Sequence, residues 1–133
     1  MQVDRYVLRQ RIDATPREAE ERIRAALADE GFGVLTEIDV RETLRAKLDV
    51  ETPPYRILGA CKPQYAHQAI EIDAAIGGLL PCNVVVREHP DGGSELIAID
   101  PNAMMALTEV PEMTEIASQV REELDRALRA AAS

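Results

Sequence analysis

The segment from His89 to Gly93 constrains the fold more than any other part of the sequence. It reads His-Pro-Asp-Gly-Gly, and its Asp91-Gly92 pair is a strong signal for a tight turn between two strands. Apolar-rich runs of strand length precede and follow it, over 82–87 and 94–100. Because so short a turn brings the chain back alongside itself, the two strands must be antiparallel.

Three further strands are predicted upstream of this hairpin. The first runs from about Val3 to Asp13, where Leu8 and Ile12 alternate with arginines in a period of two. The second covers 33–40. The third covers 55–61, and its nearly continuous apolar run is typical of a central strand covered on both faces.

Helices are predicted between these strands from their start and stop signals. Thr15 and Pro16 begin one that ends at Gly31. Pro63 begins another, predicted to run toward Ile76 and to stop at the glycine pair that follows. A short helix after Val40 and one after Asp100 are also predicted.

The last helix has the clearest hydrophobic pattern. Pro111 begins the last helix, whose apolar stripe has a period of 3.6 residues. In the short helix after Val40, Leu44 and Leu48 are one turn apart, and we expect them to dock it on the rest of the protein.

The order of elements predicts an α+β fold: a two-layer domain over residues 1–133, with a mostly antiparallel sheet and helices packed on one face.

Charge and composition exclude several classes of protein. The 24 acidic and 15 basic residues give a net charge of −9, which disfavours nucleic acid and anionic membranes as partners. The N-terminus lacks a signal-peptide pattern, and no apolar run approaches the roughly 20 residues that span a bilayer. Two cysteines in 133 residues are too few for a disulfide scaffold, so we expect a cytoplasmic protein with reduced thiols.

Four blocks of the sequence together resemble a known family. They are Gly-Phe-Gly-Val-Leu-Thr-Glu-Ile-Asp-Val at 31–40, Tyr-Arg-Ile-Leu-Gly-Ala-Cys-Lys-Pro at 55–63, Leu-Leu-Pro-Cys-Asn-Val-Val-Val at 79–86 and Ile-Asp-Pro at 99–101. In this order they are similar to the domain of unknown function 302 family. The resemblance covers most of the chain. It implies a compact α+β domain that forms homodimers, and it implies no known reaction or cofactor.

The two cysteines mark the place where a site is expected. Cys61 lies two residues before Pro63, at a helix start, where free N–H groups and the neighbouring Lys62 favour a thiolate of lowered pKa. The alternative is that Cys61 is a small buried hydrophobe at a strand end. Cys82 begins a strand that would neighbour the strand ending at Cys61. The sequence leaves both interpretations open.

The remaining candidates are polar residues near these two junctions. We take Cys61, Lys62, Tyr65, Cys82, Asn83 and Asp100 as candidate ligand-binding residues. Cys61, His67 and Cys82 would form a soft three-ligand set for zinc or copper, although their spacing matches no metal motif. His67 is otherwise explained by pairing with Glu71 one turn later, and Asp100 by capping the next helix.

Two functions follow from these candidates. The first is a non-enzymatic binding or interaction module, homodimeric, with a small-molecule pocket near Cys61–Tyr65 and Pro81–Asn83. It is favoured because catalytic motifs and phosphate-binding loops are absent from the sequence. The alternative is a thiol redox or metal-dependent activity centred on Cys61 and Cys82. The sequence names no cofactor, substrate or reaction.

Overall fold

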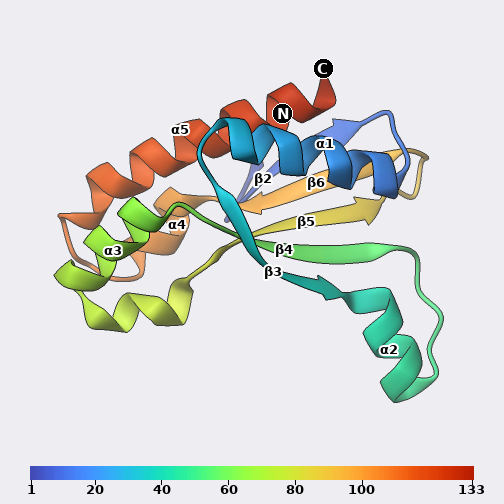
Figure 1. Cartoon of the computed structure of the whole chain (residues 1–133), viewed down its shortest axis with the longest axis horizontal. Helices are drawn as coiled ribbons and strands as arrows, with labels where there is room; N and C mark the ends of the chain where they lie inside the picture. Colours follow the sequence, from blue (N-terminus) through green and yellow to red (C-terminus); the bar gives the residue numbers. More distant parts are fainter.

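The fold is a six-stranded antiparallel sheet covered by helices, seen in a computed structural model that describes all residues from 1 to 133 (Figure 1). The strand order is β1-β2-β6-β5-β4-β3. The strands are β1 (Gln2–Asp4), β2 (Val7–Ile12), β3 (Gly33–Asp39), β4 (Tyr55–Cys61), β5 (Cys82–Glu88) and β6 (Ser94–Ile99). The helices are α1 (Pro16–Asp29), α2 (Val40–Leu48), α3 (Pro63–Ile72), the 3₁₀ helix η1 (Ala74–Leu79), α4 (Pro101–Ala106) and α5 (Met113–Ala132). The predicted α+β class is confirmed.

Local signals account for the boundaries of α1. The Thr15 hydroxyl accepts a hydrogen bond from the Glu18 N–H at 3.2 Å, and Pro16 occupies the first turn. At the other end Gly31 adopts φ of 88°, and the Phe32 N–H donates to the Leu27 carbonyl at 2.9 Å. This left-handed glycine ends the helix as predicted.

The hairpin between β5 and β6 also forms where it is predicted. The His89 N–H donates to the Gly93 carbonyl at 3.0 Å, and Gly92 and Gly93 both have positive φ. Gly93 in addition lies close to the neighbouring chain, because a Cβ there would come within 2.8 Å of the Ile12 carbonyl oxygen. Only glycine meets both requirements.

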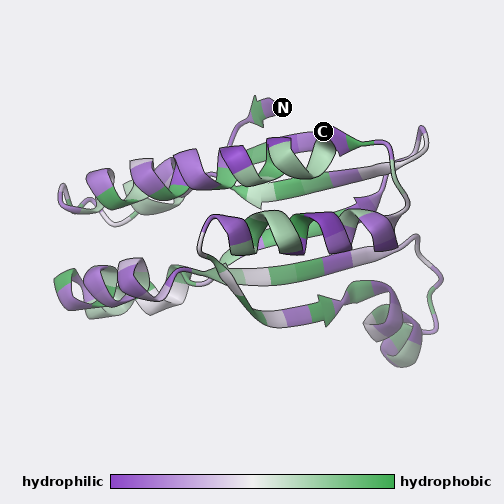
Figure 2. Cartoon of the chain, turned by 45° about the horizontal axis from the view of Figure 1, so that its top comes forward, coloured by the Kyte–Doolittle hydropathy of each residue, from purple (hydrophilic) through white to green (hydrophobic).

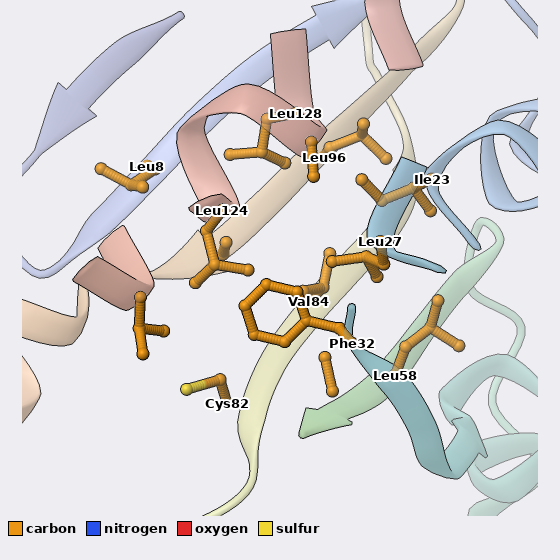
Figure 3. Packing of buried hydrophobic residues seen from close by; sticks show 14 of the residues in the cluster. Leu8, Ile23, Leu27, Phe32, Leu58, Cys82, Val84, Leu96, Leu124 and Leu128 are labelled. Carbon is orange, nitrogen blue, oxygen red and sulfur yellow. The ribbon is translucent and has the colours of Figure 1, made fainter. Parts of the chain in front are cut away.

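The hydrophobic core lies between one face of the sheet and the two long helices α1 and α5. In Figure 2 these helices lie in front of the sheet, with hydrophilic residues along them and mostly hydrophobic strands behind. Figure 3 shows aliphatic side chains from both layers meeting around Phe32, the one phenylalanine of the chain. The core is therefore aliphatic, with fully buried residues that include Leu8, Leu58, Val84, Leu96, Ile23, Leu27, Leu124 and Leu128.

The opposite face of the sheet has no helical layer over it. Ile57 in β4 and Val85 in β5 face this side and are only half-buried. The prediction that the strand over 55–61 is covered on both faces is therefore wrong. Its apolar run reflects a core on one side and an uncovered apolar surface on the other.

The structure corrects two predicted element boundaries. The first strand is divided by a turn at Arg5, which has φ of 57°, so that β1 folds back on β2 with Gln2 opposite Arg9. The helix that begins at Pro63 ends at Ile72 and not near Ile76. The Asp73 carboxylate accepts a hydrogen bond from the Ala75 N–H at 3.0 Å and caps η1 instead.

The short helix α2 forms as predicted but docks only in part, with Leu44 half-buried. None of its residues is buried, and the Leu48 side chain is 65% exposed. Asp39 caps its start by accepting from the Glu42 N–H at 3.0 Å. An apolar stripe indicates which face of a helix favours burial, but it does not show that residues of the same chain cover that face.

Candidate functional site

An apolar pocket lies where the ends of β4 and β5 meet α3, α4 and α5. Thirteen of its fifteen lining residues are hydrophobic. Its cavity is about 30 Å³, two to three times the roughly 10–15 Å³ that one water molecule needs. Four of the six predicted ligand-binding residues line it, namely Cys61, Lys62, Tyr65 and Cys82.

The two cysteines reach this pocket from adjacent strands. Cys82 begins β5 opposite Ala60, and Cys61 ends β4 as the next residue along. Both thiols are free, and Cys82 is only 7% exposed. In Figure 3 the Cys82 sulfur lies near Phe32 and below Leu124. The strand adjacency predicted from the sequence is thus present.

Burial changes the acidity of both thiols in the same direction. Desolvation raises the pKa of Cys61. For Cys82, desolvation is the larger cause and repulsion between its thiolate and that of Cys61 the smaller, and together they raise its pKa to about 11. Of the two interpretations that the sequence leaves open for Cys61, the raised pKa argues against the reactive thiolate and agrees with the small hydrophobe at a strand end. The cause of this raised pKa is the loss of water around a partly buried sulfur.

Lys62 does not serve the thiols, because its ammonium group has other partners. Its Nζ lies 2.8 Å from Oε2 of Glu123 in α5, and it sits 5.4 Å from the centre of the Phe32 ring and 5.2 Å from that of Tyr65. The Tyr65 hydroxyl donates to Oε1 of the same glutamate at 3.2 Å. These residues form a polar cap beside the apolar pocket, and we call Lys62, Tyr65 and Glu123 the Lys62 cap.

Asn83 and Asp100 lie outside this pocket. Asn83 is exposed on the uncovered face of the sheet, because it follows Cys82 in β5 and side chains alternate along a strand. Asp100 caps α4: its carboxylate accepts from the Asn102 N–H at 3.0 Å and lies 3.3 Å from Nε of Arg121. Capping explains Asp100 as the sequence suggested.

The proposed metal-ligand set does not assemble. His67 is exposed on α3, and its Nε2 lies 2.9 Å from a Glu71 carboxylate oxygen one turn further on. No group of three or more histidine, cysteine, aspartate or glutamate side chains is arranged to hold a metal ion. The set of Cys61, His67 and Cys82 is therefore a wrong prediction, because a helix carries His67 away from the sulfurs.

The sequence missed Phe32 and Glu123 as site residues. Phe32 directly follows the glycine that ends α1, and its side chain lines the pocket. Glu123 is one of several acidic residues on the polar side of α5, and 61 positions separate it from Lys62. Met104 and Met105 of α4 complete the lining with two flexible thioethers.

Comparison with known families now places the chain. The model of the family described as "Domain of unknown function DUF302" matches residues 8–131. The chain belongs to the DUF302 family. No functionally curated protein matches this DUF302 chain. None of its helices has both the length and the hydrophobicity needed to cross a membrane.

A solved structure supports the same assignment. This DUF302 chain is similar to the crystal structure of an uncharacterized conserved DUF302 protein from Bacillus stearothermophilus, with 27% sequence identity and a TM-score of 0.90. The match covers 98% of this chain and all of the other. The two proteins therefore share the complete fold. The family resemblance inferred from the four sequence blocks is confirmed.

Proposed function

We propose that this protein is a small binding module, working as a homodimer, whose pocket between Cys61, Tyr65 and Cys82 takes a compact apolar ligand. The observation that carries this proposal is the lining of that pocket, which is almost entirely hydrophobic and contains two thiols and two thioethers. Pockets with few polar groups and polarisable sulfur atoms favour small apolar molecules.

The size of the cavity limits the ligand. About 30 Å³ accommodates a group of very few heavy atoms. A larger molecule would require Met104, Met105 or Tyr65 to move, and methionine is the side chain best suited to such movement. The Lys62 cap places one charged pair and one hydroxyl beside the pocket, and these groups would orient a ligand with a single polar end.

Xenon is a suitable probe because it is apolar and compact. We expect xenon under pressure to shift the ¹⁵N–¹H signals of Ala60, Cys61 and Ala69, all of which lie at the pocket. Ala66 also lines the pocket, so Ala66→Leu should fill it and abolish the shifts. Ala130→Leu makes the same change at an exposed position of α5 and serves as the matched control.

Two results would overturn the ligand proposal. One is the absence of saturable shifts in the wild-type protein, and the other is an unchanged response in Ala66→Leu. The homodimer part is tested separately by molecular mass in solution.

A thiol activity remains the second candidate because Cys61 and Cys82 share one pocket. Raised pKa values weaken this candidate, since the thiolate is the reactive form. Fast alkylation of either thiol near neutral pH would favour it over the binding module, and slow alkylation of both would count against it.

A further inference from the structure

A second and much larger apolar groove lies on the uncovered face of the sheet. Its volume is about 590 Å³, within the range of sites that bind small molecules. Strand pairing forms its floor, because Val7 of β2 lies opposite Ile99 of β6, and Val85 of β5 lies opposite Ile97 of β6. No helix covers this floor, so the groove is separate from the buried pocket on the helix side.

The walls of the groove come from segments that flank the sheet at one end. Residues 79–81 connect η1 to β5, Leu107 follows α4, and Tyr6 lies in the turn between β1 and β2. Figure 1 shows η1 and α4 at the end of the sheet where β5 begins. Tyr6 and Leu107 are 56% and 73% exposed, so the groove is open to solvent. We call it the Leu107 groove.

The lining of the Leu107 groove favours an aliphatic ligand. Ten of its thirteen residues are hydrophobic, and none carries a charge. Tyr6 is its only aromatic side chain, so a planar aromatic ligand would find little to stack on. The only polar side-chain groups are the Tyr6 hydroxyl and the amide of Asn83, a predicted ligand-binding residue that lies outside the buried pocket. An aliphatic chain would displace water from the rest of the surface.

Basic residues lie beside the groove, although the chain as a whole is acidic. The charged side chains on this face of β1, β2, β5 and β6, together with the turn between β1 and β2, are four arginines and two carboxylates, a net charge of +2 against −9 for the whole chain. They are Arg5, Arg9, Arg11, Arg87, Asp4 and Glu95. A local positive region of this kind attracts the negative head of an amphiphilic molecule.

Arg5 is the arginine of this group that donates no hydrogen bond within the chain. Its guanidinium carbon lies 5.6 Å from the centre of the Tyr6 ring, and its side chain is 73% exposed. Its contact with Asp4 is long, at 3.6 Å, and Asp4 already accepts a hydrogen bond of 2.9 Å from Arg9. The other three arginines donate to carboxylates or to backbone carbonyls. A free guanidinium fork is suited to binding a carboxylate through two parallel hydrogen bonds.

We propose that the Leu107 groove binds a free single-chain carboxylic acid, whose aliphatic chain lies in the groove and whose carboxylate pairs with Arg5. One available guanidinium matches one negative charge, and the overall charge of −9 disfavours a more highly charged head. The inference goes beyond the function proposed for the buried pocket. The two sites are distinct, although Leu80 and Met104 contribute to the walls of both.

Titration with decanoate at neutral pH tests the site. We expect saturable shifts of the ¹⁵N–¹H signals of Val7, Ile97 and Ile99, which belong to the groove floor. Decan-1-ol has the same chain without the charge and should bind about threefold to fivefold more weakly, because an exposed ion pair adds little affinity. Acetate has the head without the chain and should not bind. The absence of saturable shifts with decanoate, or equal affinity for decylammonium, would overturn the proposal.

The substitution Arg5→Gln tests the pairing with the carboxylate. It should weaken decanoate binding by about threefold to fivefold and leave decan-1-ol binding unchanged. Arg41→Gln is the matched control, because it makes the same charge change at an exposed position in α2. Equal losses in the two variants, or a loss of decan-1-ol binding in Arg5→Gln, would overturn the role of Arg5.

The substitution Gly78→Leu tests the place of the chain. Gly78 lines the groove, and a Cβ there would meet no atom within 4 Å, so the variant should fold while its side chain takes up space in the groove. It should weaken decanoate and decan-1-ol alike, by at least fivefold. Gly77→Leu is the matched control, because a Cβ there is equally free but Gly77 does not line the groove. Unchanged binding of both ligands in Gly78→Leu would overturn the groove as their site.

Three further measurements separate this site from its alternatives. Decyl phosphate should bind no more tightly than decanoate, and tighter binding would overturn the carboxylate as the head. Cosedimentation with phosphatidylglycerol vesicles would mean that the groove meets a lipid surface, and would overturn a free acid as its occupant. Ala66→Leu fills the buried pocket and should leave decanoate binding unchanged even where it abolishes the xenon response. Loss of decanoate binding in Ala66→Leu would place the acid in the buried pocket and overturn the groove.

Discussion

The Lys62 ammonium lies 2.8 Å from Oε2 of Glu123, and this pair joins the start of α3 to α5. Each side chain is only 13% exposed. The Tyr65 hydroxyl donates to the second oxygen of the same carboxylate, and the ammonium also contacts two aromatic rings. Glu123 therefore satisfies two polar groups at once, beside a pocket that offers them no other partner.

Removal of Glu123 should destabilise the protein. Glu123→Ala leaves a mostly buried ammonium group and the Tyr65 hydroxyl unpaired, so we expect the free energy of unfolding to fall by about 2–3 kcal/mol. Glu123→Gln keeps an acceptor for Tyr65 and should cost less. Urea denaturation measures both. Glu122→Ala removes an exposed carboxylate from the adjacent position and should change stability by less than about 0.5 kcal/mol. Equal effects at 122 and 123 would contradict the role of the pair.

Gly59 is required by close contacts on the uncovered face of the sheet. A Cβ at this position would overlap Oγ1 of Thr36 and come within 2.7 Å of the Pro81 ring. We expect Gly59→Ala to cost about 1–3 kcal/mol through overpacking. Adding Thr36→Ala should recover part of the loss, because it removes one of the two contacts.

Gly78→Ala is the matched control for this substitution. A Cβ at Gly78 would meet no atom within 4 Å, and its backbone needs no positive φ. The variant should therefore retain wild-type stability in the same thermal denaturation experiment. If Gly59→Ala is equally well tolerated, the close packing around β4 is not a constraint on the fold.

Much of the fold follows from local signals in the sequence. Thr15 and Gly31 bound α1, and Gly92 with Gly93 sets the hairpin, because each of these residues acts within a few positions of itself. The turn at Arg5 escaped notice since arginine carries no preference for positive φ. The exposure of Leu48 in α2 could not be predicted, because the amphipathic pattern of Leu44 and Leu48 is the same whether or not this chain covers both residues.

The candidate site was predictable only where neighbours in sequence are also neighbours in space. Cys61, Lys62 and Tyr65 lie within one strand–helix junction, and pairing of the next strand adds Cys82. Predicting Glu123 as a site residue would have required knowledge of how α5 packs beside α3. The pKa of Cys61 depends on burial by side chains from several elements, which no local motif encodes.

Asp100 has two separable roles that substitutions can distinguish. Asp100→Ala removes both the cap of α4 and the pairing with Arg121, and should cost about 1–2 kcal/mol. Asp100→Asn keeps an acceptor for the Asn102 N–H and should cost less than half of that. Arg121→Ala tests the ion pair alone. A loss in Asp100→Asn as large as that in Asp100→Ala would show that charge, and not capping, fixes this junction.

The thiol of Cys82 should make stability dependent on alkaline pH. Its pKa is about 11 in the folded protein, against 9.0 for an ordinary cysteine. Between these values the unfolded chain binds fewer protons than the folded chain, so the free energy of unfolding falls as the pH rises. The contribution is complete below pH 9 and is lost toward pH 11, with a total of about 2–3 kcal/mol from a shift of this size.

Chemical denaturation at a series of pH values between 8 and 11 measures this dependence. Cys82→Ala removes the titrating group and should flatten that part of the curve, whereas Cys61→Ala should retain most of it. Alkylation supplies a second readout, because the labelling rate at Cys82 should keep rising above pH 9 where an ordinary thiol levels off. Identical pH profiles for the wild type and Cys82→Ala would show that the buried thiol has an ordinary pKa, and would revive the thiol activity as a candidate function.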